Sequence, residues 1–156
     1  ANIASQTWGT ANRLLYRAIE VPTTCVVRRC WWVNGSSPSA TYKISVGIYS
    51  ASITGEPAAK IVETASTDQG TGAEVQFADV TDTTLGPGLY WIALASSSTS
   101  TPIGMLTTGA TSAALDAALG FKQDSITVGA LPATATPEEE ATGYLPICGF
   151  ATTASP

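Results

Sequence analysis

Several segments of the chain alternate hydrophobic and polar side chains with the two-residue period of a β-strand. The clearest is segment 39–51, in which Ile44 and Val46 fall on one face and Lys43 and Ser45 on the other. Successive side chains of a strand point to opposite faces of its sheet, so this pattern predicts a half-buried antiparallel strand.

Shorter patterns of the same kind recur roughly every ten residues, between turns rich in Gly, Pro, Ser and Asn. They predict strands at 14–20, 24–33, 59–66, 73–80, 89–97 and 144–150, and turns at 34–39 and 83–88. Segment 109–120 is the candidate helix, and segment 130–143 is expected to be extended and exposed. We therefore expect an all-β protein, a single-domain antiparallel β-sandwich or jelly roll with at most one short helix.

The length of 156 residues suits one domain with a sizeable core. The predicted organisation is an N-terminal arm at 1–11, a β-sandwich domain at 12–150 and a flexible C-terminal tail at 151–156.

Alternation does not distinguish inside from outside in segment 24–33. One face would carry Cys25, Val27, Arg29, Trp31 and Val33, and the other Val26, Arg28, Cys30 and Trp32. Trp31 and Trp32 are adjacent and must point to opposite faces of a strand. We expect one of them to enter the core and the other to be covered by a second layer, a partner chain or a ligand.

Segment 89–95 is apolar on both faces, because Leu89, Trp91 and Ala93 oppose Tyr90 and Ile92. A strand of this kind is central in a sandwich or is covered by a partner.

These segments supply the candidate interface or ligand-stacking residues: Trp31, Trp32, Trp91, Arg28 and Arg29. Large aromatic side chains of a sandwich fill its core and subunit contacts, or stack on sugars. We expect one arginine to stack on an aromatic ring, or to pair with Glu20 or a partner's acid.

The composition removes several classes of function. Charged residues make up 12% of the chain, against about 25% in typical domains, and the net charge is -5. A surface without a basic field disfavours nucleic-acid binding. No apolar run is long enough to span a membrane, and the N-terminus has no signal-peptide pattern, so synthesis in a cytoplasm is expected.

The chain contains no histidine, which excludes Ser-His-Asp and Cys-His catalysis and His-ligated zinc. Cys25, Cys30 and Cys148 are expected to be buried thiols. Asp79 and Asp82 are weak candidates for a hard cation, with capping of the next turn as the alternative. The acidic run 138–140 is expected to be a solvated loop. We expect no cofactor and no enzymatic activity.

Three stretches resemble a group of small phage-encoded β-sandwich virion proteins. They are VGIYSA (46–51), VTDTTLGPGLYWIALA (80–95) and ALPATATPEEEATGYLPICG (130–149). The resemblance covers roughly residues 12–150, and TTLGPGLYWIAL is its most specific piece. It implies a structural role in the virion, on the head surface or the tail, and carries over no catalytic residue.

The chain has no heptad repeats, and the predicted sandwich begins near residue 12, which favours a capsid decoration protein over a fibre with a long shaft. We expect it to bind the major capsid protein or another virion protein, to self-associate as a homotrimer or other ring, and to be assembled in the host cytoplasm. The alternative is a receptor-binding or carbohydrate-binding module of a tail or fibre, with a host surface glycan as its ligand. In the first case, one of Trp31 and Trp32 should lie between subunits or against the shell.

Overall fold

The computed structural model describes residues 2–107, 120–139 and 144–152, and this part of the chain folds into β-strands without a helix. The strands are β1 (Asn2–Thr7), β2 (Arg13–Val21), β3 (Cys25–Val33), β4 (Lys43–Ala51), β5 (Pro57–Glu63), β6 (Thr67–Asp68), β7 (Val75–Leu85), β8 (Gly88–Ser96), β9 (Pro102–Thr107), β10 (Gly120–Gln123), β11 (Glu138–Glu139), β12 (Tyr144–Pro146) and β13 (Cys148–Ala151). The predicted all-β sandwich is confirmed. The predicted helix lies almost entirely outside the described residues, and its last residue, Gly120, begins β10.

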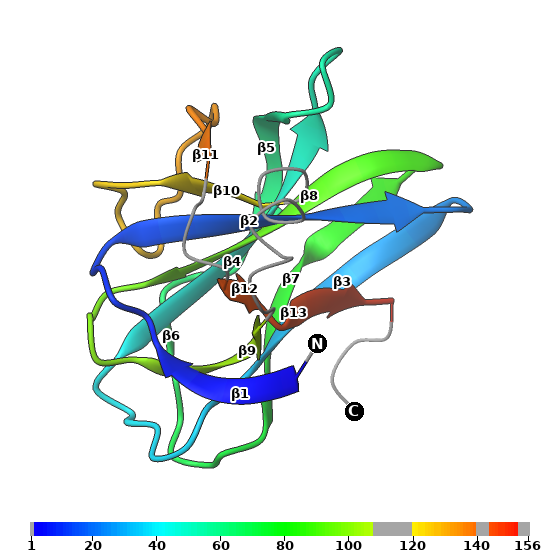
Figure 1. The fold of residues 1–156 in the computed structure, drawn as a ribbon. Helices are drawn as coiled ribbons and strands as arrows, with labels where there is room; N and C mark the ends of the chain where they lie inside the picture. Colours follow the sequence, from blue (N-terminus) through cyan, green and yellow to red (C-terminus); the bar gives the residue numbers. More distant parts are fainter. Residues whose placement is uncertain (1, 108–119, 140–143, 153–156) are drawn as a thin grey trace.

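Two layers of antiparallel strands form the sandwich (Figure 1). One layer is a seven-stranded sheet in the order β11-β10-β2-β8-β4-β5, in which β6 pairs with β4. The other consists of two three-stranded sheets, β1-β9-β12 and β13-β3-β7. Figure 1 shows β2 and β10 in the upper part of the view and β1 and β9 in the lower part. The segment interpreted as an N-terminal arm thus contains β1, which pairs with β9.

Residue Ile147 connects the two three-stranded sheets. Its N–H donates to Gly104 O at 2.9 Å, and its carbonyl accepts a hydrogen bond from Val33 N at 3.0 Å. The predicted single strand 144–150 is therefore two strands, β12 beside β9 and β13 beside β3. Proline has no N–H to donate to a neighbouring strand, and Pro146 lies at the end of β12, which is an edge strand.

The main hydrophobic core lies between the layers. Its largest fully buried side chains include Trp32, Ile44, Ile48, Ile92 and Met105. Val46 of β4 and Leu94 of β8 also belong to it, so the apolar face expected for segment 39–51 does point inward.

A second core covers the outer face of the seven-stranded sheet. Tyr16, Tyr49 and Trp91 of the sheet pack there against Ile126 and Leu131, which lie in the connection between β10 and β11. Strand β8 is therefore central and apolar on both faces because the chain itself covers its second face. Two expectations are wrong for the same reason: β4 is buried on both faces, and segment 130–143 is not simply exposed, since Leu131 is only 3% exposed.

Gly47 allows the covering segment, the connection between β10 and β11, to lie directly on the sheet. A Cβ atom at position 47 would lie 2.8 Å from Cδ1 of Leu131, so only glycine leaves room there. Tyr49 Oη donates to Pro132 O at 2.9 Å and Lys60 Nζ to Leu131 O at 2.6 Å, which hold the segment in place.

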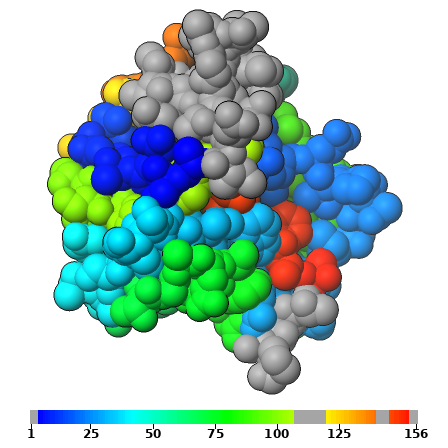
Figure 2. All heavy atoms as spheres, turned by 60° about the horizontal axis from the view of Figure 1, so that its bottom comes forward, coloured from blue at the N-terminus to red at the C-terminus, as the bar shows by residue number. Residues whose placement is uncertain are grey.

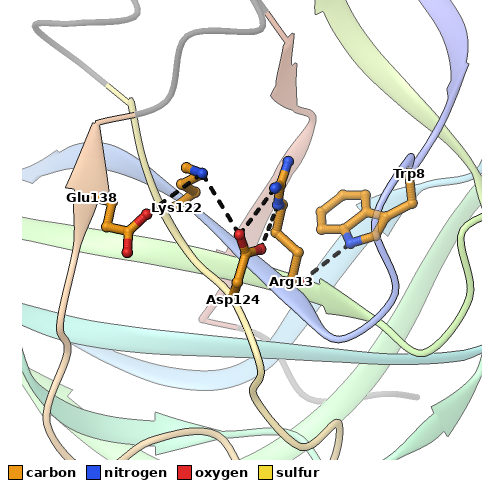
Figure 3. A network of polar contacts seen from close by, with 5 residues as sticks. All are labelled: Trp8, Arg13, Lys122, Asp124 and Glu138. Atoms are coloured by element: carbon orange, nitrogen blue, oxygen red, sulfur yellow. Dashed lines mark hydrogen bonds and ion pairs between the residues drawn. The ribbon is translucent and has the colours of Figure 1, made fainter.

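A polar network fixes the other end of the cover (Figure 3). Arg13 of β2 holds Asp124 through two hydrogen bonds, Nε to Oδ1 at 2.6 Å and Nη2 to Oδ2 at 3.0 Å. Lys122 lies between Asp124 and Glu138, at 3.6 Å and 3.5 Å, and Trp8 Nε1 donates to Arg13 O. The Arg13 guanidinium holds the pKa of the Asp124 carboxyl below its usual value. Glu138 is thus exposed, as expected for the acidic run, but it is paired. The expected loop is wrong for Glu138 and Glu139, which form β11 beside β10.

Candidate functional site

A register shift in β3 decides where the candidate residues point. Val27 pairs with Thr83 of β7, but Arg29 pairs with Asp79, so the regular alternation is interrupted between them. The core-facing series passes from Cys25 and Val27 to Cys30 and Trp32. Both faces derived from strict alternation are therefore wrong, because the irregularity exchanges them halfway along the strand.

Trp32 is the core member of the tryptophan pair and is fully buried. Its Nε1 donates to Asn34 Oδ1 at 3.0 Å. Asn34 Nδ2 in turn donates to Gln69 O and Gly72 O, at 2.8 Å and 2.9 Å. This buried asparagine therefore ties the end of β3 to the loop before β7.

Trp31 points to the opposite face of the sheet and is partly exposed. Its indole lies over Gly149 of β13, where a Cβ atom would come within 2.6 Å of Cε2. Trp31 Nε1 donates to Phe150 O at 3.3 Å. The predicted split between one inward and one outward tryptophan is confirmed.

Side chains on β7 continue the outward face. Phe77 is opposite Trp31 in the register and is 51% exposed, and Val75 is opposite Val33 and is 44% exposed. The guanidinium of Arg29 lies 5.0 Å above the ring of Phe77, which confirms the expected stacking of an arginine on an aromatic ring. We call this surface, made by Arg29, Trp31, Val33, Val75 and Phe77, the Trp31 face. Figure 2 shows the segments of β3 (blue), β7 (green) and β13 (red) at the surface.

The two neighbouring aspartates border this surface within β7. Asp79 Oδ1 is 3.1 Å from Arg29 Nε, and Asp82 Oδ2 is 3.2 Å from Arg28 Nε. They lie inside a strand and pair with arginines, so the expected capping of a turn is wrong. No group of three or more His, Cys, Asp or Glu side chains that could hold a metal ion occurs in the described residues.

Trp91 is a core residue and not a contact residue. It is 3% exposed, its Nε1 donates to Gly55 O at 2.9 Å, and it meets Phe121 edge to face at 5.2 Å. The structure therefore removes Trp91 and the fully buried Trp32 from the candidate surface. It leaves Trp31 and Arg28, whereas Arg29 is itself only 9% exposed.

An open recess of about 270 Å³ lies between β2 and β13, beside the Trp31 face. Its lining residues are Arg17, Ile19, Trp31, Cys148, Gly149 and Phe150. Burial raises the pKa of the Cys148 thiol to about 12, and that of the Cys30 thiol, also in the core, to about 12. Both are neutral thiols at ordinary pH. All three cysteines are free thiols, Cys30 and Cys148 buried as expected and Cys25 only partly so.

Sequence patterns missed three residues of this region: Arg17, Phe77 and Gly149. A signal existed for Arg17, which stands between the apolar Leu15 and Ile19 on one face of β2. Neither Phe77 nor Gly149 carries a signal of this kind, because each matters only through its register with Trp31.

The described part of the chain contains no helix long and apolar enough to cross a membrane. Comparisons of the chain with protein-family models, with curated proteins and with solved structures found no match.

Proposed function

We propose that this chain is a non-enzymatic structural protein of a bacteriophage particle, a capsid decoration protein that binds and stabilises the shell through the Trp31 face. The observation that carries the proposal is the exposed apolar strip in which Trp31, Phe77 and Val75 lie side by side on one sheet face. Contiguous exposed apolar side chains mark contact sites with other molecules, whereas scattered ones do not.

The make-up of this face fits a protein partner. Protein interfaces are enriched in aromatic residues and arginine and have few unpaired charges in their centre. Here, the two aromatic side chains lie next to Arg29, whose charge is already balanced by Asp79. A partner can therefore cover the strip without burying an unpaired charge in the interface.

The virion setting rests on the resemblance of segments 46–51, 80–95 and 130–149 to small phage β-sandwich proteins. The low content of charged residues agrees with a protein that is held in an assembly. A non-catalytic role is supported by the lack of histidine in the sequence and by the protonated state of the thiol in the recess.

The direct test is to locate the protein in intact particles by cryo-electron microscopy and to count its copies. Hundreds of copies over the head lattice are expected. A few copies at the tail tip would overturn decoration in favour of an adhesin, and absence from the particle would overturn the virion role.

Contact through the Trp31 face is tested separately with Phe77→Ser, which removes exposed apolar surface from the middle of the strip. We expect this variant to bind heads at least tenfold more weakly while its circular dichroism spectrum shows that the fold is retained. Ile53→Ser is the matched control, because Ile53 is fully exposed on the loop between β4 and β5 and does not belong to the Trp31 face. Equal binding by both variants would contradict the assignment of this face.

Self-association, with a homotrimer as the expected form, belongs to the same proposal. Light scattering tests it by measuring the molar mass of the unaltered protein and of Trp31→Ala in solution. Because the Trp31 face is assigned to the shell, the oligomer should persist in the variant, and a monomeric unaltered protein would overturn the homotrimer.

A second function, a receptor-binding or carbohydrate-binding module of a tail or fibre, is favoured by one observation. Trp31 and Phe77 are neighbouring exposed aromatic rings on a sheet face, an arrangement on which a sugar ring can stack. A glycan array probed with the protein and with Trp31→Ala tests it. Binding lost in the variant would support this function over decoration.

A further inference from the structure

Arg17 stands apart from the other cations of the chain. The sequence has seven Lys and Arg residues, and all seven lie in the described residues. Six of them form ion pairs with Asp or Glu: Arg13, Arg28, Arg29, Lys43, Lys60 and Lys122. No carboxylate of the described residues forms an ion pair with Arg17, although the chain carries a net charge of -5.

The position of Arg17 makes this lack of a partner informative. It shares a face of β2 with Leu15 and Ile19, which pack into the core between the layers. It is partly buried and lines the recess between β2 and β13. A guanidinium that is partly withdrawn from water and has no anion is an incomplete arrangement, because its desolvation is not offset by a charge-assisted hydrogen bond.

The remainder of the lining is apolar. Ile19, Trp31 and Phe150 surround Arg17, and the Cys148 thiol is neutral. The one other strong side-chain donor, Trp31 Nε1, is already engaged by Phe150 O. Apolar walls beside a single cation lower the local dielectric constant and so strengthen its attraction for an anion, although the recess is open to solvent on one side.

This lining selects among anions. A sugar acid would place several hydroxyl groups against walls that have no free side chain to pair with them, so that only hydroxyl groups at the open side keep their hydrogen bonds to water. A carboxylate on an apolar body leaves no such group unpaired. The recess volume of about 270 Å³ admits a short apolar group with its carboxylate.

We propose that this recess binds a carboxylate carried on an apolar group, with Arg17 gripping both carboxylate oxygens and Ile19, Trp31 and Phe150 holding the apolar part. The carboxylate can come from an acidic side chain of a bound protein or from a free organic acid. The site does not depend on the function proposed above, because it is defined by Arg17, which has no ion pair with a carboxylate of the described residues.

Titration of the full chain with phenylacetate, followed by ¹⁵N-¹H NMR, tests this site. The Trp31 indole N–H and the amides of 148–150 should shift and saturate. Phenylacetamide, which has the same shape without the charge, should bind at least tenfold more weakly. Glucuronate should also bind at least tenfold more weakly than phenylacetate. Equal binding of the acid and its amide, or tighter binding of glucuronate, would overturn the proposal.

Substitutions of Arg17 test whether its guanidinium binds the carboxylate. Arg17→Gln should weaken phenylacetate binding at least tenfold, and Arg17→Lys should retain part of it. Arg28→Gln is the matched control, because Arg28 is exposed and paired with Asp82, and it should bind as the unaltered protein does. Unchanged binding by Arg17→Gln, with its fold verified by circular dichroism, would refute the assignment.

A second titration distinguishes the two sources of the carboxylate. The probes are the blocked peptide acetyl-Leu-Glu-Leu-amide and its Gln counterpart. Tighter binding of the Glu peptide than of phenylacetate supports a protein side chain as the natural occupant, and weaker binding supports a free acid. Phe77→Ser should leave both titrations unchanged. Failure of the Trp31 face as a particle contact and failure of the Arg17 recess as a carboxylate site are therefore distinguishable.

Discussion

Replacing Gly149 with Ala tests the packing on which the Trp31 face rests. A Cβ atom at position 149 would lie 2.6 Å from Cε2 and 2.8 Å from Nε1 of Trp31. Non-bonded carbon atoms pack at about 3.5–4.0 Å, so the indole has to move outward by about 1 Å. The hydrogen bond from Trp31 Nε1 to Phe150 O, already 3.3 Å long, is lost in such a move.

The magnitude follows from three contributions. Forcing an extra methyl group into a packed site costs about 1–3 kcal/mol. The lost hydrogen bond costs about 1 kcal/mol. Lower backbone entropy of the unfolded chain gives back about 0.4–1 kcal/mol. The net loss of unfolding free energy is about 2 kcal/mol, and for a domain of this size that lowers Tm by about 4–8 °C.

Urea unfolding followed by circular dichroism measures this loss, and tryptophan fluorescence reports the exposure of Trp31 as a red shift. Gly86→Ala is the matched control, because nothing lies within 4 Å of a Cβ atom at position 86. We expect the control to unfold within about 0.5 kcal/mol of the unaltered protein. If Gly149→Ala also does so, with unchanged emission, Trp31 does not lie over Gly149 and the geometry of the Trp31 face is refuted.

Three further predictions concern the two cores. Leu131→Ala should lower the unfolding free energy by about 2–5 kcal/mol in urea titrations, because it opens a cavity against Gly47; a loss under 1 kcal/mol would mean that the cover does not seal the sheet. Asn34→Ala should cost about 2–4 kcal/mol by the same measurement, since it strands the buried N–H of Trp32 and two backbone carbonyls, whereas a neutral result would contradict that network. Stability should be nearly flat from about pH 5.5 to 8, because the chain has no histidine. It should fall above about pH 8.5, where the thiols of the unfolded chain ionise while Cys30 and Cys148, with pKa raised to about 12, stay protonated. Urea midpoints across this range measure it, and a Cys30→Ala/Cys148→Ala variant should lose less between pH 8 and 9.5; an equal loss would refute the assignment to these thiols.

The positions of β2, β3, β4 and β8 were predictable because they depend on local patterns. Each of these four strands contains more apolar residues than a turn or loop of the same length, and Gly or Pro lies near its ends. Strands β1 and β9 were not predicted, and the turn expected at 83–88 is wrong in its first half, because β7 continues to Leu85. The faces of β3 were not predictable, because a register shift beside Arg28 reverses the alternation and depends on pairing with β7. The adjacent arginines were the visible sign that alternation fails there.

The covered face of β8 was unpredictable for a different reason. Its partners, Ile126, Leu131 and Ala135, are spaced irregularly in a segment that contains two prolines, so neither a helical nor a strand period reveals them. Of the candidate site, the outward tryptophan could be deduced from the adjacent pair. The recess could not, because Arg17 and Gly149 are brought together only by the stacking of the two layers.

Because β13 pairs with β3, one edge of β3 stays unpaired on the ribosome until the C-terminal strand has been synthesised. Trp31 and Phe150, joined by a hydrogen bond in the finished fold, are 119 residues apart in the chain. At translation rates of about 5–20 residues per second, β3 emerges about 6–24 s before its partner strand exists. During that interval, the edge of a strongly apolar strand is open to wrong partners. Arg28 and Arg29 lie in the middle of that strand, where charge repels another copy of the same segment. Aggregation of nascent chains in cell-free translation, compared between the unaltered sequence and Arg28→Val, would measure how far the charge of Arg28 protects the chain before β13 is made.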